Sequence, residues 1–254
     1  MTESTGQILL EGAISILAAL EADSRPIHAL YARSGIDRGD RTIGRLLRLA
    51  KDAGIAIHTV ESEALDSMVT GRSHGGLVAE VGERRLADMA SLCTEAAPFV
   101  AMLDGVEDPF NYGQAIRSLY AAGADGLVVR PRSWASAAGV VARSSAGASE
   151  RIAVAQAETA EAAADFFRAR GLMVAVTDKD RAVDIYDADL TVPLFLVIGG
   201  ERRGVTRSFA DSADIRLKIP YGRSFPMSLG TTPAAAALAF EVLRQRRGKQ
   251  KHEG

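Results

Sequence analysis

Cysteine is nearly absent from the sequence, and no charge of one sign dominates it. The single cysteine, Cys93, excludes a disulfide scaffold and a zinc site built from cysteines. The formal net charge of −2 gives no overall basic footprint, which weighs against non-specific binding of nucleic acid but still allows a local patch. The four histidines are scattered, so we expect no metal site; they are His28, His58, His74 and His252.

Long hydrophobic runs are missing as well. No stretch reaches the roughly 18 apolar residues of a membrane-spanning helix, and the opening MTESTGQ lacks the basic region of a secretory signal. We therefore expect a cytoplasmic protein. A length of 254 residues with 47% hydrophobic and 24% charged residues suits one large domain or two of ordinary size.

The first third of the chain alternates between helix-like and strand-like patterns. Thr42 is a plausible N-cap of one helix, and Gly54 is a plausible stop for it. The pattern predicts an α/β/α unit that ends near Val81, followed by a polar, alanine-rich linker. We expect helices over 11–22, 42–54 and 64–69, and strands over 27–32, 55–60 and 75–81.

The rest of the chain contains several apolar, often β-branched runs separated by helical segments. This alternation predicts an α/β fold with a mostly parallel sheet covered on both faces. An alanine-rich helix with Pro233 in its first turn closes the chain. The expected strands are 99–104, 126–131, 151–156, 172–177, 194–200 and 214–220, and the expected helices between them are 111–122, 135–146 and 159–169.

Three segments are candidates for a site. Residues 104–117 follow a strand's carboxyl end, where ligands of open α/β sheets collect, although Asn111 could simply cap a helix and Arg117 could be a surface charge. Residues 197–206 contain two adjacent glycines but match neither a P-loop nor GxGxxG, so a tight turn is the alternative. Residues 219–235 form a long loop that is either functional or an ordinary connection.

In order and spacing, these three segments resemble the motifs of the SpoU/TrmH class of SPOUT RNA methyltransferases. The first 85 residues resemble the L30e-like substrate-binding domain that many members carry. The matching positions are Asp104, Val106, Asp108, Pro109, Asn111, Gly113 and Arg117 in the first motif, Gly199, Glu201, Gly204, Asp214, Ile219 and Pro220 in the second, and Ser228 and Leu229 in the third.

The resemblance implies a domain order and an activity. It implies an L30e-like RNA-binding domain over 1–82, a linker over 83–97, and a SPOUT methyltransferase domain over 98–254 with a deep trefoil knot near 195–235. The implied reaction is methyl transfer from S-adenosylmethionine to a ribose 2′-hydroxyl of rRNA or tRNA. The implied assembly is a homodimer through the C-terminal domain, with no membrane and no metal involved.

The resemblance also implies roles for individual residues. Arg117 would position phosphate or stabilise an oxyanion, in its own subunit or in the partner's site, while Asn111 would orient Arg117 or the ribose and Glu201 would hold the arginine. The residues implied in cofactor binding are Thr177, Gly199, Gly200, Ile219, Ser228 and Leu229.

One position departs from the family pattern. Gly230 stands where the family carries an active-site asparagine, and Thr231 and Thr232 follow where a serine is usual. Two alternatives therefore stay open: a non-catalytic RNA-binding relative, or methylation of a base nitrogen. A nicotinamide-dependent dehydrogenase is a poor fit, because no GxGxxG follows an early strand.

Overall fold

The computed structural model describes residues 7–69, 74–131, 137–179, 181–200 and 204–252. These residues form two compact units, which are described separately. Unit 1 comprises residues 1–85 and 133–151, and unit 2 comprises residues 86–132 and 152–254. The grouping of 133–151 with unit 1 differs from the strictly sequential domain order that the sequence suggests.

Unit 1 is built on a four-stranded sheet in the order β1-β4-β2-β3. β2 and β3 are parallel, and β4 is antiparallel to both β1 and β2. The strand β1 lies where the sequence pattern indicated only the approach to a helix. The elements are β1 (Ile8–Glu11), α1 (Ala13–Glu21), β2 (Ile27–Arg33), α2 (Arg41–Asp52), β3 (Ala56–Val60), α3 (Ser62–Met68), β4 (Leu77–Val81), α5 (Ala138–Ser144) and α6 (Ala148–Arg151).

Helix α2 shows how local sequence sets an element of unit 1. Its N-cap is Asp40, whose carboxylate accepts hydrogen bonds from the backbone N–H groups of Thr42 and Ile43, so the expectation of Thr42 as the cap was wrong. The apolar positions of the helix face the core, where Leu46 and Ala50 are buried. Gly54 follows the helix with a φ of 70°, which glycine adopts without steric cost.

Small residues let α5 and α6 pack tightly inside unit 1. Ala138 and Ala142 belong to the same hydrophobic core as the sheet and α1. A Cβ atom at Gly139 would lie 2.9 Å from the carbonyl oxygen of Leu9, and one at Gly147 would lie 2.7 Å from the Cβ of Ala18. Larger residues at either glycine would push these helices away from the core.

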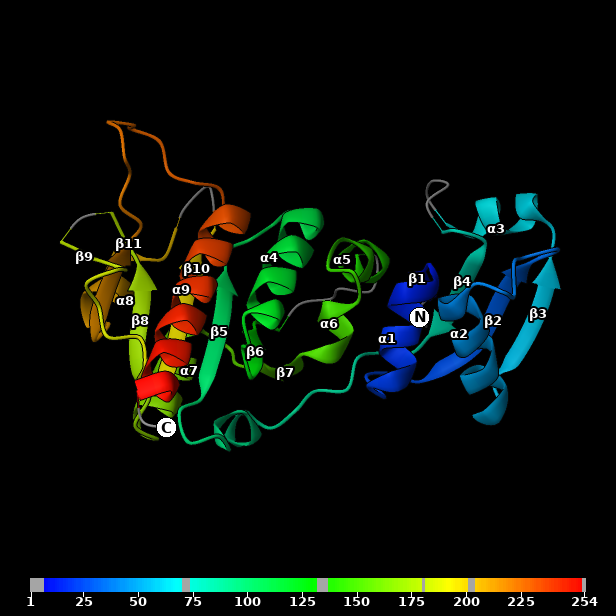
Figure 1. The fold of residues 1–254 in the computed structure, drawn as a ribbon, viewed down its shortest axis with the longest axis horizontal. Coiled ribbons are helices and arrows are strands. Elements are labelled where there is room, and N and C mark those ends of the chain that lie inside the picture. Colours follow the sequence, from blue (N-terminus) through cyan, green and yellow to red (C-terminus); the bar gives the residue numbers. More distant parts are fainter. Residues whose placement is uncertain (1–6, 70–73, 132–136, 180, 201–203, 253–254) are drawn as a thin grey trace, which may run out of the picture. The chain divides into compact units, whose positions relative to one another are not determined.

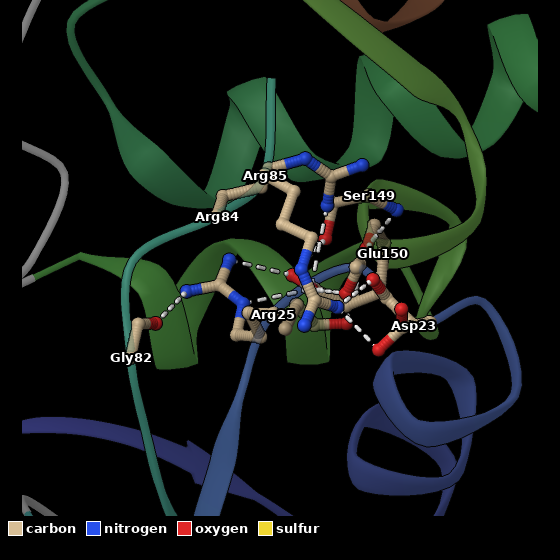
Figure 2. Close-up of polar contacts among 10 residues, drawn as sticks. Asp23, Arg25, Gly82, Arg84, Arg85, Ser149 and Glu150 are labelled. Carbon is tan, nitrogen blue, oxygen red and sulfur yellow. Dashed lines mark hydrogen bonds and ion pairs between the residues drawn. The ribbon is translucent and has the colours of Figure 1, made fainter. Parts of the chain in front are cut away.

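A buried ion-pair cluster joins three parts of unit 1 (Figure 2). The carboxylate of Glu150, on α6, accepts hydrogen bonds from the Ser24 hydroxyl at 2.6 Å and from the Arg25 guanidinium at 2.9 and 3.0 Å. Arg84 lies 3.3 Å from the same carboxylate. Burial raises the pKa of Glu150, but the two arginines and the hydrogen bonds outweigh it and hold this pKa below its usual value.

Unit 2 is built on a seven-stranded sheet in the order β7-β6-β5-β10-β8-β11-β9, in which every neighbouring pair is parallel (Figure 1). The short β9 and α8 were not expected from the sequence. The elements are η1 (Met89–Cys93), β5 (Phe99–Asp104), α4 (Pro109–Ala121), β6 (Gly126–Val129), β7 (Ala153–Gln156), α7 (Ala160–Arg168), β8 (Met173–Thr177), β9 (Val183–Asp184), β10 (Leu194–Gly199), α8 (Arg207–Ser212), β11 (Ile215–Lys218) and α9 (Thr231–His252).

The central strands of unit 2 are buried on both faces. All six residues of β5 are buried, and so are five of the six residues of β10, as expected for parallel strands covered by helices. Phe167 of α7 packs against Phe195 of β10, with ring centroids 4.7 Å apart. Helices α4 and α9 lie side by side in this unit (Figure 1). Among the described helices, none is long and apolar enough to cross a membrane.

Candidate active site

The carboxyl ends of four adjacent parallel strands in unit 2 bring the sequence motifs together. β5 ends at Asp104, β10 at Gly199 and β8 at Thr177, while Ile219 directly follows the end of β11. Asp104 and Gly199 are register partners, so their strands end at the same level. Ligands of open α/β sheets bind at this edge, where the strand order changes direction. We therefore take this edge as the candidate active site.

Two adjacent glycines allow the first two motifs to touch. The backbone N–H of Gly200 donates to the carbonyl of Asp104 at 2.7 Å. A Cβ atom at Gly200 would lie 2.1 Å from the Gly105 oxygen, and one at Gly199 would lie 2.7 Å from the Val205 nitrogen. The space a side chain would need is thus filled by the chain's own backbone. Both glycines are required by the fold, in addition to any role in binding a cofactor.

Thr177 links two strand ends at this edge. Its hydroxyl oxygen accepts a hydrogen bond from the backbone N–H of Gly199 at 3.2 Å. Both residues are partly exposed, so they lie at the surface of the edge and not beneath it. The contact fixes the end of β10 relative to β8 and places the two expected cofactor residues side by side.

An ion pair at the same edge was not foreseen from the sequence. The Arg130 guanidinium lies 2.8 Å from the carboxylate of Asp104, which is only 7% exposed. Burial raises the pKa of Asp104, the nearby charge of Arg130 partly opposes that rise, and Glu161 adds to it. Asp104 ends β5, and Arg130 directly follows the neighbouring parallel strand β6. The sequence predicts that each lies at the carboxyl end of a strand, but only the order of the strands in the sheet brings the two together.

The first turn of α4 connects the first motif with the helix of the third. Its N-cap is Asp108, which accepts from the backbone N–H of Asn111 at 2.7 Å, so the reading of Asn111 as the cap was wrong. Asn111 lies in the first turn, and its carbonyl accepts a hydrogen bond from the hydroxyl of Thr232 at 3.2 Å. Thr232 belongs to the first turn of α9, immediately after the loop of the third motif.

Arg117 lies away from the strand ends. It is the ninth residue of α4, about 12 Å along the helix axis from Pro109. Its side chain is exposed, and no hydrogen bond or ion pair engages it among the residues that the structure describes. At 100° per residue it shares the outward face of α4 with Phe110 and Tyr120, which are 55% and 41% exposed. Within one chain, therefore, Arg117 does not meet Thr177 and Gly199.

The loop of the third motif lies outside the packed part of unit 2. Residues 221–229 are exposed, including Ser228 and Leu229, and the loop reaches beyond the strand ends (Figure 1, orange). The loop is closed on itself, because the backbone N–H of Leu229 donates to the Tyr221 hydroxyl at 2.9 Å. Of the expected cofactor residues, Thr177, Gly199, Gly200 and Ile219 lie at the edge, whereas Ser228 and Leu229 lie on this loop.

Some expectations concern residues outside the described ranges. Glu201 lies among residues 201–203, which are not described. The segment near 195–235 contains those residues, so the trefoil knot stays a prediction. In the described part of the chain, no group of three or more histidine, cysteine, aspartate or glutamate side chains is arranged to hold a metal ion.

Comparison with known proteins identifies the family. The model of the SpoU rRNA methylase family matches residues 98–239, and the model described as the RNA 2′-O ribose methyltransferase substrate-binding domain matches residues 9–87. YacO of Bacillus subtilis, named as a TrmH family tRNA/rRNA methyltransferase, is 33% identical over 240 residues, which cover 92% of this chain and 94% of YacO. The 23S rRNA (guanosine-2′-O-)-methyltransferase RlmB of Pseudomonas putida is 31% identical over 245 residues, covering 94% and 97%.

A solved structure agrees with these sequence matches. The SpoU methyltransferase AviRb from Streptomyces viridochromogenes, in complex with the cofactor AdoMet, superimposes with a TM-score of 0.79 at 25% identity, covering 96% of this chain and 92% of AviRb. The fold, the converging motifs and the relatives agree. The chain belongs to the SpoU rRNA methylase family and is an S-adenosylmethionine-dependent RNA methyltransferase with an N-terminal substrate-binding domain.

Proposed function

We propose that this protein methylates a ribose 2′-hydroxyl of rRNA or tRNA at the carboxyl edge of the sheet in unit 2. The observation that carries the proposal is the convergence of Asp104, Thr177 and Gly199 at adjacent strand ends. The 2′-O position is supported by the name of the Pseudomonas putida relative, a guanosine-2′-O-methyltransferase. We place the reaction in the cytoplasm, with the RNA on which it acts.

The edge has the chemistry that S-adenosylmethionine needs. Gly199 leaves the end of β10 partly exposed and without a side chain, while Gly200 is buried against Gly105, and Ile219 after β11 is apolar and partly buried. Leu229 and Ser228 would complete the site from the loop of the third motif. When bound, the cofactor supplies an electrophilic methyl group. The protein holds the adenosine of the cofactor against the backbone and leaves the methyl group accessible to the ribose 2′-hydroxyl of the RNA.

Arg117 is the residue that we assign to the RNA. A guanidinium stays protonated, so it acts as a donor to a phosphate or to the oxygen on which charge develops, and not as a base. The absence of a carboxylate partner among the described residues leaves all its donors available. Asn111 and Glu201 are proposed as the groups that orient the ribose or the arginine.

The position of Arg117 supports a homodimer in which it serves the partner's site. It lies between Phe110 and Tyr120 on the outward face of α4, and Phe240 of α9 is 48% exposed. An exposed aromatic face is typical of an interface. The small residues expected to allow close packing between subunits, such as Ala235 and Ala239, are already buried within the chain, so the exposed aromatic residues are the better interface candidates.

The direct test is methyl transfer from labelled S-adenosylmethionine to unmodified 23S rRNA and tRNA transcripts. Nuclease digestion and mass analysis would then locate the methyl group, and we expect it on a ribose. A methyl group on a base would favour the base-methylating alternative, to which the missing side chain at Gly230 points. Cofactor binding without transfer to either RNA would favour a non-catalytic relative. Light scattering at micromolar concentration tests the dimer, and a mass of one chain would contradict it.

A further inference from the structure

The described arginine and lysine residues of unit 1 fall into two groups. Six of them form ion pairs with a carboxylate; they are Arg25, Arg45, Arg84, Arg85, Arg143 and Arg151. A second group makes no ion pair or side-chain hydrogen bond with any described residue, and it occupies a single segment of the chain. Its members are Arg33, Arg38, Arg41, Arg48 and Lys51. Figure 2 shows three arginines of the first group, Arg25, Arg84 and Arg85, each beside an acidic side chain.

Helix α2 places two of the unpaired arginines, Arg41 and Arg48, on one face together with the paired Arg45. Arg41, Arg45 and Arg48 follow the spacing i, i+4, i+7, which places them within about 60° of one another on one face. All three are exposed, while Leu46 and Ala50 on the opposite side are buried. The helix therefore presents a basic stripe about 10 Å long to solvent.

The loop before α2 adds to this stripe. The carbonyl oxygen of Arg38 lies 3.0 Å from where a Cβ atom of Gly44 would be, so the loop folds along the first turn of the helix. Gly44 borders the basic face of α2, on the same side as Lys51. A larger residue at Gly44 would press against this loop and displace Arg38 from the stripe.

The nearby carboxylates of Asp37 and Asp40 form no ion pair with these cations and accept hydrogen bonds from backbone groups instead. Asp37 accepts from the backbone N–H of Gly39 at 2.8 Å, and Asp40 caps the helix through two backbone N–H groups. Of the stripe residues, only Arg45 is paired, with Glu21. The chain as a whole has a net charge of −2, so this group of unpaired arginines is a local basic patch. Arginine suits such a patch, because its guanidinium can donate two parallel hydrogen bonds to two oxygens of one phosphate.

We propose that Arg38, Arg41, Arg48 and Lys51 form the surface through which unit 1 holds the phosphate backbone of the substrate RNA. The proposal rests on the function proposed above and specifies where the RNA lies on the N-terminal unit. Phosphate contacts carry no base preference, so this surface orients the RNA and leaves the choice of nucleotide to other groups.

The test is the double variant Arg41→Gln/Arg48→Gln in the full-length protein. Glutamine keeps the helix propensity, and Arg45 stays in place to preserve its ion pair. The matched control, Arg170→Gln/Arg247→Gln, removes two exposed positive charges of unit 2 that form no ion pair with a described residue, just after α7 and near the end of α9. The probe is a 23S rRNA transcript, with affinity measured by filter binding between 50 and 300 mM KCl.

We expect the double variant to bind RNA about 10-fold or more weakly at 0.1 M salt. The slope of log affinity against log salt should fall by about 1.4 to 1.8, because each lost phosphate contact removes about 0.7 to 0.9. Binding of S-adenosylmethionine should be unchanged, and the control should bind RNA like the parent.

Two results would overturn this surface. One is a folded double variant with the parent's affinity and salt slope, and the other is an equal loss of affinity in the control. Neither depends on catalysis. If the parent protein binds RNA but methylates none, the proposed reaction fails while this measurement still decides the surface.

Discussion

The cluster around Glu150 in unit 1 and the outward face of α4 in unit 2 differ in how their charged side chains are paired. In unit 1, Glu150 is 2% exposed, and its carboxylate is contacted by Ser24, Arg25 and Arg84; the two arginines are labelled beside it in Figure 2. In unit 2, Arg117 is exposed on the outward face of α4 and has no partner among the described residues, whereas Asp104 at the strand ends is paired with Arg130. The first arrangement uses its charges to hold structure, and the second leaves a charge available to a substrate.

This difference has a physical basis. A buried carboxylate is stable only when its hydrogen-bonding capacity is filled, so a structural cluster becomes fully paired. A charge that stabilises a transition state must keep some hydrogen-bond donors for the substrate, even where another group holds its orientation. The pairing of each charged residue is therefore a guide to its role, and the variants below test that guide.

The largest expected effect is on stability, from Glu150→Gln. The change removes the buried carboxylate that the guanidinium of Arg25 contacts, and breaking such a buried pair typically costs about 3–5 kcal/mol. We expect the free energy of unfolding of the full-length protein to fall by about this amount in chemical denaturation. Glu83→Gln is the matched control, because Glu83 is exposed and close in sequence, and it should change stability by less than about 0.5 kcal/mol.

The same pair should show a characteristic pH dependence. The pKa of Glu150 in the folded protein lies below its ordinary value of 4.5, so its contribution to stability is present above that value and is lost as the pH falls through the folded-state pKa. The stability difference between the parent and Glu150→Gln should therefore be full at pH 7 and shrink below about pH 4.5. A difference that is constant from pH 7 to pH 3 would contradict the assignment.

Arg117→Ala should act on rate and not on stability. We expect methyl transfer to fall by about 10² to 10³, the usual cost of losing one donor to a developing charge, with cofactor affinity unchanged. Arg117→Lys should restore little, since an ammonium cannot reproduce the planar fork of a guanidinium. Arg170→Ala, which removes an exposed arginine elsewhere in unit 2, is the control. Transfer at the parent rate by Arg117→Ala would make this residue a surface charge.

Gly200→Ala tests whether the strand-end edge is set by backbone contacts. A Cβ atom 2.1 Å from the Gly105 oxygen forces the two motif segments apart, at about 1–3 kcal/mol of stability and with loss of cofactor binding. Gly222→Ala is the control, because no atom lies within 4 Å of its added Cβ. Calorimetry with S-adenosylmethionine measures the cofactor affinity of both variants. If a folded Gly200→Ala variant binds the cofactor as tightly as the parent, the strand-end edge is not the cofactor site.

A mixture of the last two variants tests whether Arg117 acts in trans. In a mixed dimer, the Arg117→Ala chain keeps an intact cofactor edge while the Gly200→Ala chain keeps the arginine. Transfer above the level of either variant alone is expected if the arginine serves its partner's site. No recovery in a mixture proven to contain mixed dimers would place Arg117 in its own subunit's site.

The smallest effect is expected from Thr177→Val, which removes the hydroxyl that accepts from the Gly199 N–H. A single neutral hydrogen bond contributes about 0.5–1.5 kcal/mol, so stability and cofactor affinity should change only slightly. Thr177→Ser keeps the hydroxyl and should behave like the parent in both denaturation and calorimetry. A larger loss in the serine variant would show that the methyl group, and not the hydroxyl, matters at this position.

The position of Arg117 shows where reasoning from sequence stops. Its spacing from Asn111 predicts that both lie on one helix after a strand, and the structure has them on α4. On a helix, six residues of spacing put Asn111 and Arg117 about 9 Å apart along the axis and about 120° apart around it. The sequence does not tell which surroundings each of these two faces meets. For the same reason the N-caps were misplaced: Asp40 and Asp108 precede the expected positions, and only backbone geometry distinguishes them.

By itself, the sequence determined six of the seven strands of the second sheet, their parallel character and the identity of the motif residues, because apolar runs and glycines act through short-range sterics. Tertiary structure alone decided three other things. It paired Asp104 with Arg130, it placed residues 133–151 in unit 1, and it surrounded Gly199 and Gly200 with backbone. These contacts join residues distant in the chain, and such pairings depend on how whole elements pack, which no local pattern encodes.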